Sequence, residues 1–95
     1  MMNSYETIFI INSNLSEDDT KNMVTKFKSL IESAGTIDSV EDWGKRRLAY
    51  EINDEKEGYY TLINFKADPQ FPRELERNYK ITDGILRYLV VKKDK

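Results

Sequence analysis

The sequence predicts an α+β fold, in which a four-stranded antiparallel sheet carries two helices on one face. Strand-like and helix-like segments alternate in the order strand, helix, strand, strand, helix, strand (βαββαβ). The chain has 95 residues, enough for one domain and too few for a second. Hydrophobic residues make up 39% of it, which is too many for a wholly disordered protein. We therefore expect residues 1–95 to form a single folded domain.

The first third of the chain predicts one strand and one helix. Residues 5–11 are almost continuously apolar and rich in Ile, Phe and Thr, as in a central strand. Ser16 is a typical helix N-cap, with Asp19 three residues later as a capping-box acid. Gly35 is expected to close the helix as its C′ residue. Between the caps, apolar residues recur at helical spacing: Met23, Val24, Phe27, Leu30, Ile31 and Ala34.

A long hairpin is predicted next. Residues 37–43 and 46–52 form one strand pattern, interrupted at Gly44, where a glycine indicates a bulge or bend. The polar segment 53–58 predicts the hairpin loop, and 59–65 predicts the third strand.

The last third predicts a helix and a strand. The helix spans 71–81, with Pro72 in its first turn and three apolar residues facing inward: Phe71, Leu75 and Tyr79. A turn at 83–84 leads to a strand over 85–92. With right-handed crossovers, the two βαβ units give a ferredoxin-like sandwich whose first and third strands are central.

The sheet face turned away from the helices is expected to be open and apolar. Alternation of side chains along the strands assigns six residues to it: Ile8, Ile10, Tyr60, Leu62, Leu89 and Val91. An apolar patch of this size usually binds a partner.

Charge is distributed unevenly along the chain. The net charge is −2, made of −5 in residues 1–43, zero in 44–65 and +3 in 66–95. The cluster Lys45-Arg46-Arg47 lies beside Trp43 and Tyr50. Such a cluster can bind RNA phosphates and stack on bases. It can equally belong to an edge strand, where basic side chains prevent pairing with the sheet edge of another molecule.

A second basic group lies on the predicted helix 71–81. Its members share one helix face: Arg73, Arg77 and Lys80. An ordinary solvated helix face explains this spacing at least as well as a binding surface does.

Residue types argue against an enzyme. The chain has no cysteine and no histidine, so thiolate chemistry and the usual zinc ligands are excluded. The acidic run 17–19 is explained by the start of a helix, and Glu41-Asp42 is more typical of a solvated strand edge than of a metal site. No glycine-rich phosphate loop is present. We expect no cofactor and no metal.

Neither a membrane span nor a signal peptide is expected. No apolar run reaches the length of about 18–20 residues that a transmembrane helix needs. The first six residues have no basic region ahead of an apolar one. A reducing cytoplasm is the expected location.

One RNA-binding class with this fold is disfavoured. The classical RNA-recognition motif stacks bases on aromatic side chains of its central strands. In the window 57–64, Thr61 and Asn64 stand where those aromatic residues belong. The open face, lined by Ile and Leu, is more typical of a protein contact.

The chain resembles the bacterial small-subunit ribosomal protein six family over nearly its whole length. The strongest resemblance is the segment 44–53, Gly-Lys-Arg-Arg-Leu-Ala-Tyr-Glu-Ile-Asn, which fits the family signature. Three further landmarks follow the family order: Tyr5-Glu6, Gly58-Tyr59-Tyr60, and 81–87 leading to Val90-Val91-Lys92.

The resemblance implies a structural role in the small (30S) ribosomal subunit. Family members bind the central domain of 16S ribosomal RNA together with ribosomal protein eighteen. By position, the implied RNA-binding residues are Tyr5, Arg46, Arg47, Lys80, Arg87 and Lys92. The apolar sheet face is the expected contact for the protein partner, through Ile8, Ile10, Trp43, Tyr60, Leu62 and Leu89.

This sequence departs from the family in two ways. The basic residue at position 80 is a lysine, which cannot bind phosphate through two parallel hydrogen bonds as arginine does. The sequence ends at Lys95, whereas many members carry a C-terminal extension.

Two other functions remain as alternatives. A sensor domain of the same fold could dimerise through the open sheet and bind no RNA. An acyl-phosphate hydrolase would need an arginine and a glycine loop after the first strand, where this chain has Asn12-Ser13-Asn14-Leu15.

Overall fold

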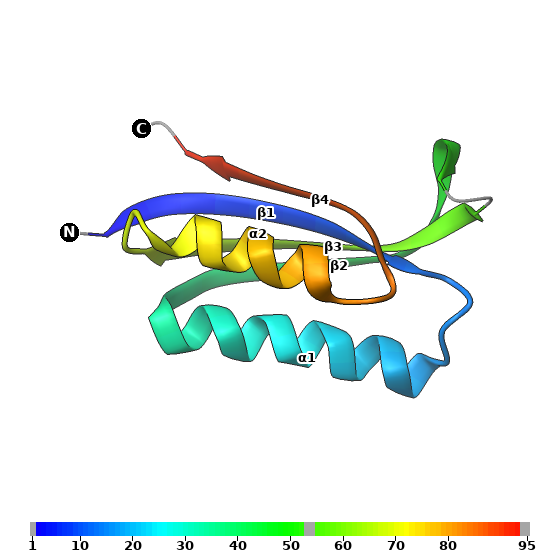
Figure 1. Ribbon diagram of the computed structural model, residues 1–95, viewed down its shortest axis with the longest axis horizontal. Coiled ribbons are helices and arrows are strands. Elements are labelled where there is room, and N and C mark those ends of the chain that lie inside the picture. The colour runs from blue at the N-terminus through cyan, green and yellow to red at the C-terminus, as the bar shows by residue number, and fades with distance from the viewer. Residues whose placement is uncertain (1, 53–54, 94–95) are drawn as a thin grey trace.

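The observed order of elements agrees with the prediction. The computed structural model describes the backbone of residues 2–52 and 55–93, and their side chains except those of 49–52 and 55–56. The elements are β1 (Asn3–Asn12), α1 (Glu17–Ala34), β2 (Gly35–Ile52), β3 (Glu55–Ala67), α2 (Phe71–Ile81) and β4 (Ile85–Lys92). The four strands form one antiparallel sheet in the order β2-β3-β1-β4, so β1 and β3 are central. Both helices run side by side along one face of this sheet (Figure 1).

The β2–β3 hairpin is longer than predicted. The segment 53–58 was expected to be loop, but β3 already begins at Glu55, and it extends to Ala67 rather than ending at residue 65. Arg47 pairs with Glu57 across the hairpin. Opposite charges on paired strands stabilise each other, so a polar composition did not prevent strand pairing here. The predicted loop residues 53 and 54 lie outside the described residues.

The ends of α1 are set by two different kinds of contact. At its start, the Ser16 hydroxyl accepts a hydrogen bond from the Asp19 backbone N–H at 3.1 Å, which confirms the predicted cap. At its end, Gly35 follows the last helical residue as expected, but with φ −172° it is extended rather than left-handed. A Cβ on Gly35 would collide with the Lys66 carbonyl oxygen. Glycine is therefore needed because β3 passes so close, and not for a left-handed turn.

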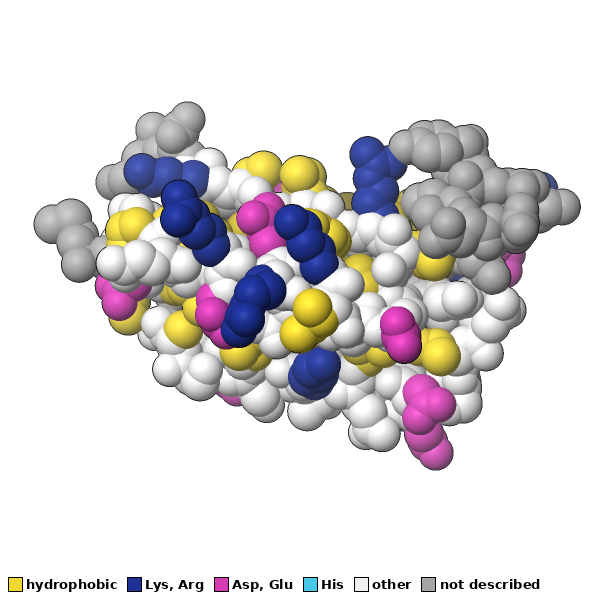
Figure 2. All heavy atoms as spheres, viewed as in Figure 1, with side chains coloured by type: hydrophobic (Ala, Val, Ile, Leu, Met, Phe, Trp, Pro, Cys, Tyr) yellow, Lys and Arg dark blue, Asp and Glu magenta, His cyan; other side chains and the backbone are white. Residues whose placement is uncertain are grey.

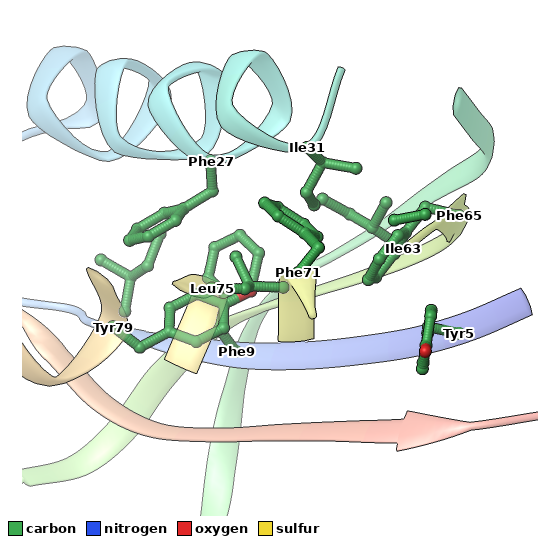
Figure 3. Close-up of a cluster of buried hydrophobic side chains, with 11 residues drawn as sticks. Tyr5, Phe9, Phe27, Ile31, Ile63, Phe65, Phe71, Leu75 and Tyr79 are labelled. Atoms are coloured by element: carbon green, nitrogen blue, oxygen red, sulfur yellow. The ribbon is translucent and has the colours of Figure 1, made fainter. Parts of the chain in front are cut away.

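A single core fills the space between the sheet and the helices (Figure 3). Phe27 lies at its centre, with its ring centroid 5.3 Å from that of Phe9 on β1 and 4.6 Å from that of Tyr79 on α2. The inward positions predicted for both helices are confirmed, since Phe27, Ile31, Leu75 and Tyr79 are fully buried and Phe71 nearly so. The helix-covered face of the sheet contributes Tyr5, Phe9, Ile11, Ile63, Phe65 and Ala67.

Candidate functional site

The open face of the sheet gathers the apolar residues that were predicted to bind a partner. Ile8 pairs with Leu62 on one side and with Leu89 on the other, and Ile10 pairs with Tyr60. Trp43 joins them from the edge strand, its ring stacked on that of Tyr60 with centroids 6.2 Å apart. The structure therefore brings these six predicted residues onto one surface, which we call the open-face patch: Ile8, Ile10, Trp43, Tyr60, Leu62 and Leu89.

Members of this patch differ in how much surface they offer. Leu89 is 54% exposed and Trp43 39%, and Ile8 and Tyr60 are half-buried. Ile10 and Leu62 are each only 7% exposed, contrary to the expectation of a fully open face. A partner would therefore contact mainly the exposed and half-buried members.

Part of the open face is covered by the chain itself. Leu48, far along β2, is buried, and its Cδ2 lies 3.6 Å from where a Cβ on Gly58 would stand. The same Cβ would collide with Ile10 Cγ2, so Leu48 and Ile10 approach Gly58 from the same face. Leu48, from the far end of the hairpin, therefore lies near Ile10 on this face, and both side chains are buried.

A β-bulge shapes the border of the patch. The pairing of β2 with β3 shifts between Asp42 and Gly44, and Gly44 has φ +74°, which confirms the predicted interruption. Asp42 Oδ1 accepts a hydrogen bond from the Gly44 N–H at 3.3 Å, and Oδ2 accepts one from the Tyr59 hydroxyl at 2.9 Å. That bond to a carboxylate, with some help from burial, raises the pKa of Tyr59 above its usual range. The extra residue of the bulge is Trp43, whose indole N–H donates to Glu41 Oε1 at 3.3 Å.

Two of the predicted RNA-binding residues, Arg46 and Arg87, flank the patch. Arg87 lies on β4 opposite Ile10 and lines a shallow groove of about 270 Å³ together with Ile8, Tyr60 and Leu89. Arg46 is exposed on β2, and its Nε donates a hydrogen bond to the Trp43 carbonyl oxygen at 3.0 Å.

Three other predicted RNA-binding residues lie away from this border. Arg47 pairs with Glu57 and, by alternation, lies on the opposite face of the strand from Arg46. Lys80 is exposed in the last turn of α2, on the helix layer. Lys92 is five residues beyond Arg87 and therefore roughly 17 Å along β4. The structure does not bring the six predicted residues into one compact site.

Tyr5 is a buried residue, which does not suit the predicted RNA contact. It is 5% exposed, and its ring stacks on Phe65 at 5.6 Å between centroids. The alternation that puts Ile8 and Ile10 on the open face puts Tyr5 on the helix-covered face. Its ring is not available to stack on a base, so we leave it out of the proposed interface.

Basic side chains from the last third of the chain extend beyond the border of the patch. Figure 2 shows dark blue Lys and Arg side chains gathered over α2 and along β4. Arg73 and Arg77 belong to the exposed residues of α2, although Arg77 is paired with Glu74 at 3.4 Å. Lys93 reaches across β1 to donate to Asn64 Oδ1 at 2.9 Å.

Neither a cluster of metal-binding side chains nor a membrane-spanning helix is found among the described residues. They contain no group of three or more acidic side chains placed to hold a metal ion. Neither helix in this part of the chain has the length and apolarity to cross a membrane.

Comparison with known proteins identifies the family. The family model described as Ribosomal protein S6 matches residues 4–92. The chain belongs to the ribosomal protein S6 family. Similar members include the small ribosomal subunit protein bS6 of Clostridium novyi (strain NT), 55% identical over 95 residues that cover 99% of this chain and 100% of that protein. The protein of the same name from Clostridium perfringens (strain SM101 / Type A) is 53% identical over 94 residues, covering 98% and 99%.

A solved member of the S6 family has the same fold. The crystal structure of 30S ribosomal protein S6 from Thermotoga maritima superposes with a TM-score of 0.93 at 40% sequence identity, covering 98% of this chain and 89% of that one. Both the predicted fold and the predicted resemblance are therefore confirmed. As a member of the S6 family, the chain is a structural, non-enzymatic component of the small ribosomal subunit in the cytoplasm.

Proposed function

We propose that this S6 family member binds the central domain of 16S ribosomal RNA as a pair with ribosomal protein eighteen of the small subunit. The observation that carries the proposal is the open-face patch, an exposed apolar surface bordered by Arg46 and Arg87. The protein partner covers the patch, and the bordering arginines contact RNA phosphates beside the partner.

Exposure of the patch supports a protein partner. Leu89 and Trp43 of the patch are large apolar residues that the described chain leaves exposed, and so is Val91, two residues beyond Leu89 on the same face of β4. Apolar surface of this kind gains free energy when a partner removes it from water. Leu89 and Ile8 are expected to lie near the middle of the contact.

The charge of the chain supports a requirement for that partner. A net charge of −2 gives little general attraction to phosphates, so the chain alone should bind RNA weakly. Arg46 and Arg87 supply guanidinium groups that suit phosphate oxygens. Arg47, Lys80 and Lys92 then act as outlying contacts with neighbouring phosphates rather than as parts of one binding pocket.

The test is a titration of a central-domain fragment of 16S ribosomal RNA, with and without ribosomal protein eighteen, at several salt concentrations. We expect tight binding only with the partner, and a weakening with salt whose slope counts the phosphates contacted. Arg46→Ala and Arg87→Ala should each weaken binding of the pair and flatten the slope.

The matched control for both arginine variants is Lys21→Ala. It removes one positive charge from an exposed position on α1, on the other side of the sheet. If Lys21→Ala weakens binding as much as the arginine variants, the effect is one of net charge and the assignment of the contacts fails. If the wild-type chain binds no RNA with or without the partner, the proposed function fails.

A further inference from the structure

Trp43 connects two parts of the proposed interface. It belongs to the open-face patch, the proposed contact for the protein partner, and it bonds to Arg46, a proposed RNA contact. Its indole is 39% exposed and stacks on Tyr60 within the open-face patch. Its backbone carbonyl oxygen accepts the hydrogen bond from Arg46 Nε at 3.0 Å. One bulged residue therefore forms part of the apolar patch and also fixes the neighbouring arginine.

The bond at Nε does not occupy the two terminal amino groups of Arg46, which form its phosphate-binding end. Neither terminal amino group of this guanidinium makes a hydrogen bond to another of the described residues. A phosphate can therefore accept from both at once. Because the side chain is already anchored through Nε, it has less freedom to lose when RNA binds.

Asp42 holds the bulge in place from the other face of β2. Its two carboxylate oxygens accept from the Gly44 N–H and from the Tyr59 hydroxyl, at 3.3 and 2.9 Å. Tyr59 belongs to β3, a central strand, so this bond ties the edge-strand bulge to the interior of the sheet. Gly44 permits the local backbone, since φ +74° is readily adopted by glycine and rarely by other residues.

We propose that Asp42 and Tyr59 are positioning residues for RNA binding: their hydrogen bond fixes the Trp43 bulge and thereby the direction in which Arg46 presents its terminal amino groups. This inference rests on the proposed function and gives a role to two residues outside both predicted contact sets. A partner seated on the Trp43 ring restrains the same bulge, so partner binding and the placement of Arg46 favour each other.

The variant that tests this is Tyr59→Phe, which removes the hydroxyl and keeps the ring. With ribosomal protein eighteen present, we expect affinity for the central-domain RNA fragment to fall roughly threefold to tenfold. Its salt slope should be shallower by about 0.7–0.9, the change for one lost phosphate contact. Because Trp43 is the only tryptophan, the emission of the free chain should also shift.

Two further variants separate positioning from a general effect on the fold. Asp42→Asn can keep both contacts, because its amide oxygen accepts from the Gly44 N–H and its amide N–H can donate to the Tyr59 hydroxyl oxygen, so it should lose less affinity than Tyr59→Phe. Tyr88→Phe is the matched control, because it removes a tyrosine hydroxyl on β4 and leaves the bulge unchanged. Circular dichroism should show all three variants folded.

The outcomes distinguish this inference from the proposed function. If Arg46→Ala weakens RNA binding while Tyr59→Phe and Asp42→Asn retain wild-type affinity and slope, the positioning role is wrong and the proposed function stands. If Tyr88→Phe weakens binding as much as Tyr59→Phe, the effect is not specific to the bulge and the positioning role is wrong. If the wild-type chain binds no RNA in either condition, both fail together.

Discussion

Tyr79 on α2 donates a buried hydrogen bond to Thr7 on the central strand β1, with 3.0 Å between the two hydroxyl oxygens. The direction follows from a second bond: the single proton of the Thr7 hydroxyl goes to the Leu89 carbonyl oxygen at 2.9 Å. Thr7 must therefore accept from Tyr79. This chain of two bonds links α2, β1 and β4 through the interior and satisfies two buried polar groups that would otherwise be costly.

Tyr79→Phe should lower the free energy of unfolding by about 1 kcal/mol, because one buried hydrogen bond is lost while the ring keeps its packing on Phe9 and Phe27. Urea denaturation measures the change. Tyr88→Phe is the control, since that half-buried ring stacks on Tyr79 at 5.2 Å between centroids. A Tyr79→Phe variant as stable as the wild type would contradict the proposed role of the bond.

Stability should fall at alkaline pH because Tyr79 is buried. Burial raises the pKa of Tyr79 well above the value of about 10 that a tyrosine has in an unfolded chain. Above pH 10 the unfolded state has therefore lost a proton that the folded state still holds. The unfolded state binds fewer protons, so stability decreases as pH rises, by up to about 1.4 kcal/mol per unit from this one group.

Urea denaturation at pH 9, 10 and 11 measures this decline. The wild type and Tyr88→Phe should both lose stability across the series. Tyr79→Phe should lose less, since it lacks the phenol concerned, and an equally steep decline in that variant would assign the effect to other groups.

Thr61→Val should stabilise the chain. The Thr61 side chain is fully buried on β3, and its hydroxyl has no hydrogen-bond partner among the described residues. Valine has nearly the same shape, suits a strand and removes the unsatisfied group, for a gain of roughly 1 kcal/mol. Thr7→Val is the opposite control, because it breaks two bonds and should destabilise. A loss of stability in Thr61→Val would indicate that the hydroxyl is satisfied in solution.

Leu89→Asp should abolish pairing with ribosomal protein eighteen and leave the fold intact. The side chain is 54% exposed, so the carboxylate remains solvated in the free protein, but the partner would have to bury it unpaired. Calorimetry of the two proteins and a thermal melt of the variant measure both effects. Val40→Asp is the matched control. Val40 is 37% exposed on the edge strand β2, and its strand partner Ile63 lies on the helix-covered face, so Val40 is not part of the open-face patch. If Leu89→Asp binds ribosomal protein eighteen as tightly as the wild type does, the partner does not contact Leu89 and the proposed contact is wrong.

The two faces of the sheet could be predicted from the sequence because side chains alternate along a strand, and the registers Ile8–Leu62 and Ile10–Tyr60 agree with that alternation. Alternation also contained the information that Tyr5 lies with Phe9 and Ile11 in the core. Tyr5 was assigned to RNA binding only because it matches a position in the family. Such a match does not take into account which face of the sheet the residue occupies. Its burial follows from the helices that cover that face.

Local sequence determined the elements of this protein: the Ser16 cap, the apolar stripe centred on Phe27, and the interruption of β2 at Gly44 all depend on residues close together in the chain. Only the tertiary structure decided which surface remains open. Leu48 lies near Ile10 beside Gly58, Asp42 bonds to Tyr59, and Arg46 is anchored beside the Trp43–Tyr60 stack. The pairing of the strands and the course of the long hairpin bring these residues together. Periodicity specifies the face on which a side chain lies, whereas its burial and its bonding partners depend on segments that folding brings together.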